Sequence, residues 1–282
     1  MTVLGLDAST GAVDVVLAYG GPVAAGADPT ARWPRAYRPG PARPAATLLD
    51  AVSGLLAASG LSLAALDGVA VAVGPGSYAG VRAAVATAKA LAWAAGLPLA
   101  AVGSLEALAF TAGPPPAVVA TALDARRDRV YGAVYRLVGG LPSAVVPPAL
   151  WSRAHWVEAV RGIVGAAGPE GAVCRLAGAG WLPEDVAALS DVVDGSFTVT
   201  SSVGGAASRL VGLGSRPASP DGSPCRAEDT EPPVAQGVAA VGMLRLARGE
   251  SADPLTLVPA YVSDPDIGPV RAGVGPGGAG GG

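Results

Sequence analysis

Histidine, lysine and cysteine are scarce in this sequence, and each shortage excludes a class of site. The only histidine among the 282 residues is His155, so one chain cannot supply a two-histidine metal site, and no Ser-His-Asp or Cys-His arrangement is supported. The two cysteines, Cys174 and Cys225, lie far apart and match no metal or redox spacing. We therefore expect reduced thiols in a cytoplasmic protein that holds no metal.

Charged residues and uninterrupted hydrophobic runs are also few. Only 15% of residues are charged and the net charge is -3, so the chain lacks the concentrated basic field that non-specific nucleic-acid binding requires. The most apolar window, residues 83–102, is mostly alanine and contains Lys89, Gly96 and Pro98, so we expect no membrane span. The first residues include Asp7 and no basic side chain, so we expect no secretory signal.

Residues 69–103 form the stretch around which the rest of the chain is organised. An apolar run at 69–73 meets a Gly-Pro-Gly turn, a long Ala/Val-rich segment follows, and a second apolar run begins at Leu97. This pattern predicts strand, turn, helix and parallel strand. The predicted helix, residues 77–95, has only Arg82 and Lys89 as charges, and a helix that is apolar all round is normally buried. Either a second domain of this chain or a partner should cover it.

The remaining pattern predicts an α/β protein with mixed sheets and helices on their faces. Before the central stretch we expect strands at residues 3–8, 12–19 and 23–27, a loop at 28–44 and a helix at 45–59. After it we expect helices at 105–111, 152–164, 183–189, 203–213 and 234–248, and strands at 118–125, 130–137 and 173–177.

Composition changes indicate where domains begin and end. The length favours about two domains, and the run Gly113-Pro114-Pro115-Pro116 has the composition of a joint. We predict a first domain at residues 1–112, a second at 113–232, a C-terminal segment at 233–262 whose helix packs back on the first domain, and a disordered Gly/Pro-rich tail at 263–282.

Two turns have the composition of nucleotide-binding loops, and each has a plainer explanation. The turn Gly74-Pro75-Gly76-Ser77 opens a helix as phosphate loops do, but it matches neither the dinucleotide nor the P-loop spacing; the alternative is a structural elbow with Ser77 as helix cap. Asp7, followed by Ser9 and Thr10, ends a strand where a metal–nucleotide would sit, or it stabilises a turn through side-chain hydrogen bonds.

A third segment, residues 124–131, is the densest charge cluster of the chain. It contains Arg126, Arg127 and Arg129 together with Asp124 and Asp128. A solvated hairpin with weak local ion pairs is its plainest interpretation.

Three segments taken together resemble the TsaB (YeaZ) family of tRNA threonylcarbamoyladenosine biosynthesis subunits. They are VLGLDAST, the elbow GPGSYAGVRAAVATAKALAWAAGLPLAAVGSLEALA, and DARRDRVYGAVY, and the match runs from Val3 to about Tyr135. The resemblance implies the two-domain sugar-kinase/Hsc70/actin-like (RNase H-like) fold. It also implies a non-catalytic scaffold that binds the catalytic paralogue TsaD and the ATPase TsaE in a complex that modifies the adenosine next to the anticodon.

The resemblance further implies how this chain would meet its partners. In the family, helices equivalent to 45–59 and 77–95 pack against the partner's helices, tRNA is reached through the complex, and the free subunit can form a homodimer. The implied interface residues are Ala46, Asp50, Ser53, Gly54, Ala57, Tyr78, Ala79, Arg82, Ala86, Lys89 and Trp93. A vestigial nucleotide site would use Asp7, Ser9, Thr10, Gly74, Gly76 and Ser77. We expect no cofactor, with a nucleotide at the partner interface left open.

Two activities from other classes stay open beside this interpretation. One is an ATP-dependent small-molecule kinase of the same fold, with Asp7 at the metal, Gly74 near phosphate and Asp124 as base. The other is a metallopeptidase, an activity once attached to the family's catalytic paralogue.

Overall fold

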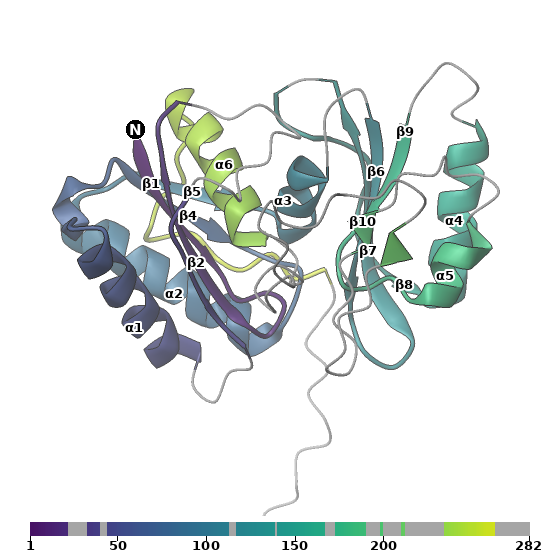
Figure 1. Ribbon diagram of the computed structural model, residues 1–282, viewed down its shortest axis with the longest axis horizontal. Helices are drawn as coiled ribbons and strands as arrows, with labels where there is room; N and C mark the ends of the chain where they lie inside the picture. Colours follow the sequence, from purple (N-terminus) through teal and green to yellow (C-terminus); the bar gives the residue numbers. More distant parts are fainter. Residues whose placement is uncertain are drawn as a thin grey trace, which may run out of the picture.

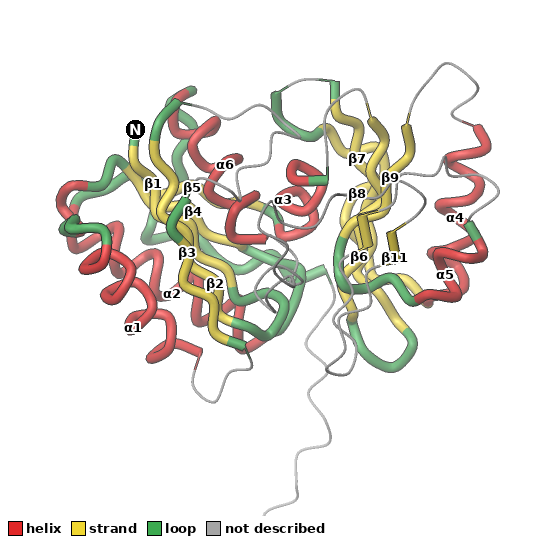
Figure 2. The backbone as a smooth tube through the Cα atoms, viewed as in Figure 1, coloured by secondary structure: helices red, strands yellow, loops and turns green. Residues whose placement is uncertain are grey.

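The chain folds into two mixed β-sheets that lie side by side with helices between and outside them (Figures 1 and 2). The computed structural model describes residues 1–21, 33–39, 44–112, 117–138, 140–166, 173–189, 198–199, 210–211 and 234–262.

The first sheet has the strand order β3-β2-β1-β4-β5. Its strands are β1 (Thr2–Asp7), β2 (Val13–Tyr19), β3 (Arg35–Arg38), β4 (Gly68–Ala72) and β5 (Leu99–Val102). β1 pairs antiparallel with β2 and parallel with β4, which in turn pairs parallel with β5. Both faces of the central strands are buried, as expected for parallel strands that helices cover on each side.

Two pairs of helices cover the two faces of this sheet. α1 (Pro44–Ala58) and α2 (Tyr78–Ala95) pack on the outer face, while α3 (Ser104–Thr111) and α6 (Val234–Ala247) lie on the face toward the second sheet (Figure 1). β1 serves both cores, because Leu4 and Leu6 point toward α1 and α2 whereas Val3 points toward α3 and α6. A short 3-10 turn, η2 (Leu63–Ala65), links α1 to β4.

A partly buried ion pair fastens α6 to α3. Arg245 donates through Nη2 to both carboxylate oxygens of Glu106, at 2.7 and 3.0 Å, and Gly103 N donates to Glu106 Oε2 at 3.3 Å. Burial raises the pKa of Glu106, and the charge of Arg245 opposes that shift. Both helices thereby keep a fixed position between the two sheets.

The second sheet has the order β8-β7-β6-β9, and its strands are arranged like those of the first sheet. Its strands are β6 (Ala117–Asp124), β7 (Arg129–Leu137), β8 (Ser143–Ser152) and β9 (Val173–Ala177). α4 (Arg153–Ala166) and α5 (Pro183–Ala188) cover its outer face, and β10 (Thr198–Val199) pairs with β11 (Leu210–Val211) (Figure 1). The rings of Trp151, Trp156 and Trp181 stack in sequence under α4.

The central strands of the two sheets have matching surroundings. β1 and β6 are each antiparallel to the next strand, each parallel to β4 or β9, and each ends in Asp-Ala. Asp7 Oδ1 accepts from Ser9 N at 3.0 Å, and Asp124 Oδ1 accepts from Arg126 N at 3.0 Å. The two hairpin turns therefore begin with the same side-chain hydrogen bond.

The two sheets also share a close backbone contact, made by a glycine that follows β4 in one and β9 in the other. A Cβ on Gly80 would collide with the carbonyl oxygen of Ala8, and one on Gly178 would collide with that of Ala122. Each contact brings the backbone that follows a parallel strand against the end of the central strand.

Five expectations from the sequence were wrong or lie wholly or partly outside the described residues. The stretch expected as a loop, 28–44, contains β3, because Arg35 reaches across to the buried Asp14 and pairs its strand with β2. The strand expected at 23–27, the joint at 113–116 and the tail at 263–282 lie outside the described residues. Within the helix expected at 203–213, only residues 210–211 are described, and they form strand β11 instead.

β8 was not predicted because its sequence, with Pro147 and Pro148, lacks a strand-like alternation. Its pairing with β7 shifts register between Gly132 and Tyr135. Prolines are tolerated at such irregular positions because no ladder hydrogen bond is required there. None of the described helices is long and apolar enough to cross a membrane.

The contact of Gly80 predicts a large effect of a single added methyl group. We expect Gly80→Ala to lower the free energy of unfolding by about 2 kcal/mol, because the new Cβ must displace the backbone of Ala8. Gly162→Ala in α4 is the matched control, since its Cβ would meet no atom within 4 Å, and it should raise stability by about 0.5 kcal/mol. Urea unfolding of both variants measures the difference; equal stability would contradict the close contact.

Candidate functional site

The outward face of α1 is almost free of large side chains. Leu48, Val52 and Leu55 point into the core beneath the helix. The opposite face is exposed and carries the residues predicted from the sequence, namely Ala46, Asp50, Ser53, Gly54 and Ala57. Small side chains at these positions allow another helix to approach the backbone closely.

α2 continues this exposed surface. Tyr78, Ala79, Arg82, Ala86 and Trp93 are all exposed, and Trp93 leaves 67% of its surface in water. α1 and α2 pack on the same side of the first sheet, and the second sheet lies beyond the opposite side (Figure 1). In the described part of the chain the second sheet therefore does not cover this face, which we call the α1/α2 face.

Lys89, the only lysine of the chain, bonds to the C-terminal segment, residues 251–262. Its Nζ donates to the carbonyl oxygen of Leu257 at 2.8 Å and of Leu255 at 3.4 Å. Farther along, Ala260 N donates to Val73 O at 2.7 Å. The segment thus runs beside α2 in the opposite direction.

The end of the C-terminal segment forms an aromatic cluster with the start of α2. The rings of Tyr78 and Tyr261 lie 5.2 Å apart, and the Arg82 guanidinium donates to the Tyr78 hydroxyl at 3.2 Å and lies over its ring. Exposed Leu255 and Val258 add apolar surface beside it. Sequence analysis did not find this extension of the α1/α2 face, because nothing local in residues 251–262 indicates which helix they accompany.

The Gly74–Gly80 elbow closes on the first hairpin turn. Ser77 N donates to Ser9 O at 2.6 Å, and Ser77 Oγ accepts from Gly80 N at 3.4 Å, which makes Ser77 the N-cap of α2. A Cβ on Gly76 would collide with the carbonyl oxygen of Ser9. These amides are engaged within the chain, so the geometry favours a structural elbow, and a nucleotide at Gly74, Gly76 and Ser77 stays a prediction.

Asp7 is fully buried at the end of β1, opposite Asp14 on β2. Burial raises the pKa of Asp7 to about 7; the hydrogen bonds from Ser9 oppose the shift, and the nearby Asp14 charge adds to it. Asp14 instead forms an ion pair, in which Arg35 donates to both carboxylate oxygens of Asp14, at 2.7 and 2.8 Å. Thr10 is half-buried at the turn.

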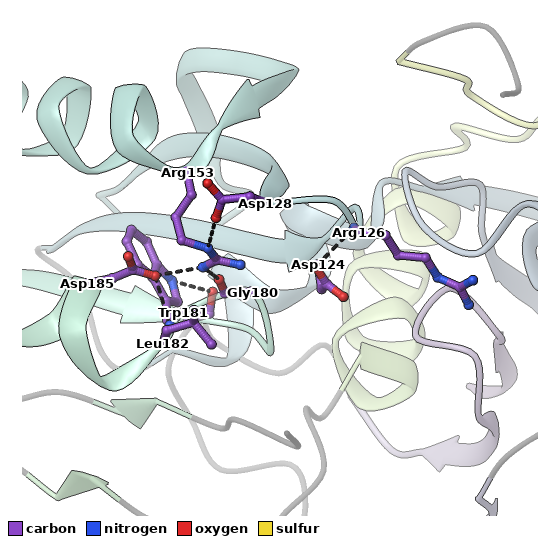
Figure 3. A network of polar contacts seen from close by, with 9 residues as sticks. Asp124, Arg126, Asp128, Arg153, Gly180, Trp181, Leu182 and Asp185 are labelled. Atoms are coloured by element: carbon purple, nitrogen blue, oxygen red, sulfur yellow. Dashed lines mark hydrogen bonds and ion pairs between the residues drawn. The ribbon is translucent and has the colours of Figure 1, made fainter. Parts of the chain in front are cut away.

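The charged turn between β6 and β7 has an unusual backbone (Figure 3). Arg126, Arg127 and Asp128 all adopt positive φ, at 63°, 53° and 56°, which side chains other than glycine rarely do. Arg153 clamps the turn by donating to Asp128, Asp185 and the carbonyl of Gly180.

Metal-ligating residues do not gather anywhere in the described ranges. No group of three His, Cys, Asp or Glu side chains in them could hold a metal ion. His155 is exposed on α4, Cys174 is buried on β9, and Cys225 lies outside the described residues.

Comparison with known proteins finds similarity to proteins of tRNA modification. A family model described as TsaD, tRNA N6-adenosine threonylcarbamoyltransferase, matches residues 44–177. The chain is 34% identical over 113 residues to the tRNA threonylcarbamoyladenosine biosynthesis protein TsaB of Bacillus subtilis (strain 168), a match that covers 40% of this chain and 49% of that protein. It is 56% identical over 50 residues to the tRNA N6-adenosine threonylcarbamoyltransferase of Maricaulis maris (strain MCS10), covering 18% and 13%.

Solved structures extend the likeness over nearly the whole chain. YeaZ from Pseudomonas aeruginosa matches with a TM-score of 0.61 and 25% identity, covering 92% of this chain and 99% of that one. A protein described as uncharacterized, with similarity to peptidase YEAZ from Pseudomonas aeruginosa, matches with a TM-score of 0.61 and 26% identity, covering 93% and 99%. The chain is therefore similar to TsaB/YeaZ proteins in both sequence and fold.

This similarity agrees with the two-sheet architecture. The fold is the actin-like (RNase H-like) fold, as the sequence resemblance implied, and each lobe has a mixed sheet with helices. The curated match spans about half the length of the Bacillus TsaB.

The buried Asp7 predicts a pH-dependent gain in stability when its charge is removed. The pKa of Asp7 in the folded protein, about 7, lies above the ordinary value of 3.8. Between these pH values the folded state binds the proton more tightly than the unfolded state does, so the free energy of unfolding falls as the pH rises from about 4 to 7. Asp7→Asn should therefore stabilise the fold by up to about 4 kcal/mol at pH 8 and by far less at pH 4. Urea unfolding of both proteins at the two pH values measures this; an equal difference at both would contradict the raised pKa.

Proposed function

We propose that this protein is a non-catalytic subunit of the complex that forms N6-threonylcarbamoyladenosine in tRNA. In this proposal it docks through the α1/α2 face onto a TsaD-type catalytic paralogue, and it works together with the ATPase TsaE. The observation that carries the proposal is the exposure of this nearly chargeless face in a chain similar to TsaB/YeaZ proteins.

The chemistry of the α1/α2 face suits a helical partner. Ala46, Gly54, Ala79 and Ala86 leave room for close helix packing, and the exposed Trp93 supplies the kind of large aromatic side chain that dominates interface energies. A standard specific interface buries about 800 Å² on each partner, which two helix faces of this length can provide.

The match to the TsaD family model supports a paralogue as the partner. The matched residues, 44–177, include both α1 and α2, so a TsaD-type protein has counterparts of the same two helices. Two related chains can then pair these helices about an approximate two-fold axis. When no paralogue is present, a second copy of this chain can use the same face to form a homodimer.

The proposal that the subunit is non-catalytic rests on the small number of metal-ligating side chains. A two-histidine metal site cannot be built from His155 alone, and the described residues contain no other cluster of metal ligands. We propose that the subunit holds no cofactor within one chain and that any nucleotide binds where it meets its partner.

A bulky charge on the α1/α2 face should prevent docking. We expect Ala86→Arg, and separately Gly54→Arg, to abolish co-purification with TsaD, because a guanidinium would have to be buried between close-packed helices. Gly162→Arg on the exposed face of α4 is the matched control and should co-purify normally.

Thermal unfolding of each variant alone verifies that the fold is intact. Normal co-purification of both Ala86→Arg and Gly54→Arg would contradict docking through this face. Loss of co-purification for Gly162→Arg would show that arginine substitutions disturb the complex without regard to place.

A kinase of the same fold is the second candidate, and one observation favours it. Asp7 and Asp124 end corresponding strands of the two sheets and begin the same kind of turn, as paired carboxylates of a phosphoryl-transfer site would. Tight binding and turnover of Mg-ATP by the pure chain would support this candidate. An inert pure chain that activates TsaD would remove it.

A metallopeptidase is the remaining alternative, because one similar structure is described by its likeness to a peptidase. Metal analysis of the purified chain tests it: stoichiometric zinc or iron would support a peptidase, and a metal-free active subunit would contradict it.

A further inference from the structure

The turn between β6 and β7, residues 124–129, has a strained backbone. Its three residues at positive φ each cost about 1 kcal/mol or more relative to ordinary backbone. All three are exposed, so burial of their side chains does not offset this cost.

The first hairpin turn begins in the same way but has a different backbone: its loop is one residue longer, and Gly11 is its only residue with positive φ. Both turns begin with Asp-Ala and with an Asp carboxylate that accepts a backbone amide two residues later, at 3.0 Å. Where the first turn continues with Ser9, Thr10 and Gly11, the second continues with Arg126, Arg127 and Asp128. The Asp-Ala start that the two turns share therefore does not itself require arginine at positions 126 and 127.

A rigid support holds the second turn in place (Figure 3). Arg153 N donates to Asp128 O at 3.0 Å, and its guanidinium donates to Asp128 Oδ1 at 3.2 Å and to the buried Asp185 at 2.7 Å. Asp185 in turn accepts from Leu182 N at 2.8 Å. The turn is thus fixed to both α4 and the loop before α5.

Arg126 points away from this support. Figure 3 shows its side chain extending from the turn on the side opposite Arg153, and it makes no side-chain hydrogen bond or ion pair with the described residues. A planar guanidinium suits bidentate binding of a phosphate, and the rigid turn reduces the backbone freedom that is lost on contact.

We propose that the 124–129 turn contacts the phosphate backbone of the tRNA, through Arg126 and the adjacent Arg127. This inference rests on the proposed function, which makes tRNA the substrate of the complex. The α1/α2 face lies on the outer side of the first sheet, away from the second sheet, so a partner docked there leaves the turn open (Figure 1). A local contact of this kind needs no large basic field and is compatible with a net charge of -3.

The test compares tRNA affinities of complexes reconstituted from the full chain, TsaD and TsaE. The variant R126S/R127T replaces both guanidinium groups with small polar side chains and leaves the contacts of Arg153 with Asp128 in place. We expect it to assemble normally, to bind unmodified tRNA about tenfold more weakly near 0.1 M salt, and to reduce the salt slope of the affinity by about two.

Two further variants separate a phosphate contact from a general loss of charge. R136S/R248S removes the same charge from exposed positions elsewhere, and its affinity should stay within about twofold of the wild type. R126K/R127K keeps both charges at the turn and should retain most of the salt slope.

The outcomes distinguish failure of this inference from failure of the docking proposal. If R126S/R127T assembles and binds tRNA like the wild type, the phosphate contact is contradicted while docking stands. If the variant fails to assemble, the turn contacts a protein and the inference is likewise overturned. If the wild-type chain does not co-purify with TsaD, the docking proposal fails first, and tRNA binding by the chain alone then decides the inference by the same comparison.

Discussion

The backbone at the start of α2 lies directly against the backbone at the end of β1, and this contact fixes the position of the α1/α2 face. Gly76 and Gly80 allow the start of α2 to rest directly on the carbonyls of Ala8 and Ser9, where any Cβ would collide. Because α2 is fixed at this point, its outer face has one orientation relative to α1. The position of the α1/α2 face is therefore set by the contact between α2 and the end of β1.

The fold shows a repeated plan that has diverged at its turns. Both central strands end in Asp-Ala, and both are met by glycines that follow a parallel strand. In the first lobe the carboxylate, Asp7, is buried beneath small turn residues; in the second, Asp124 is exposed and the turn carries arginines. One lobe thus has a turn around a buried carboxylate, whereas the other has a turn that exposes arginines to solvent.

Local sequence patterns predicted the structural elements that depend on residues close together in the chain. The helices α1 and α2, the cap at Ser77 and the exposed small residues all follow from helical periodicity and turn chemistry. β3 was not predictable, because Arg35 is placed there by the distant, buried Asp14. The C-terminal segment was missed for the same reason, since the bonds from Lys89 to its carbonyls join residues more than 160 positions apart. The contact of Arg153 with Asp128 was missed as well, because it joins the 124–129 turn to a residue 25 positions away.

Radical footprinting of exposed aromatic side chains measures the central claim directly. Trp93 on the α1/α2 face and Tyr19 at the end of β2 are both highly exposed in the free chain, at 67% and 50%. Docking of TsaD on α1 and α2 predicts that oxidation of Trp93 falls sharply in the complex while oxidation of Tyr19 is unchanged. A complex that forms with Trp93 still fully reactive would contradict the account.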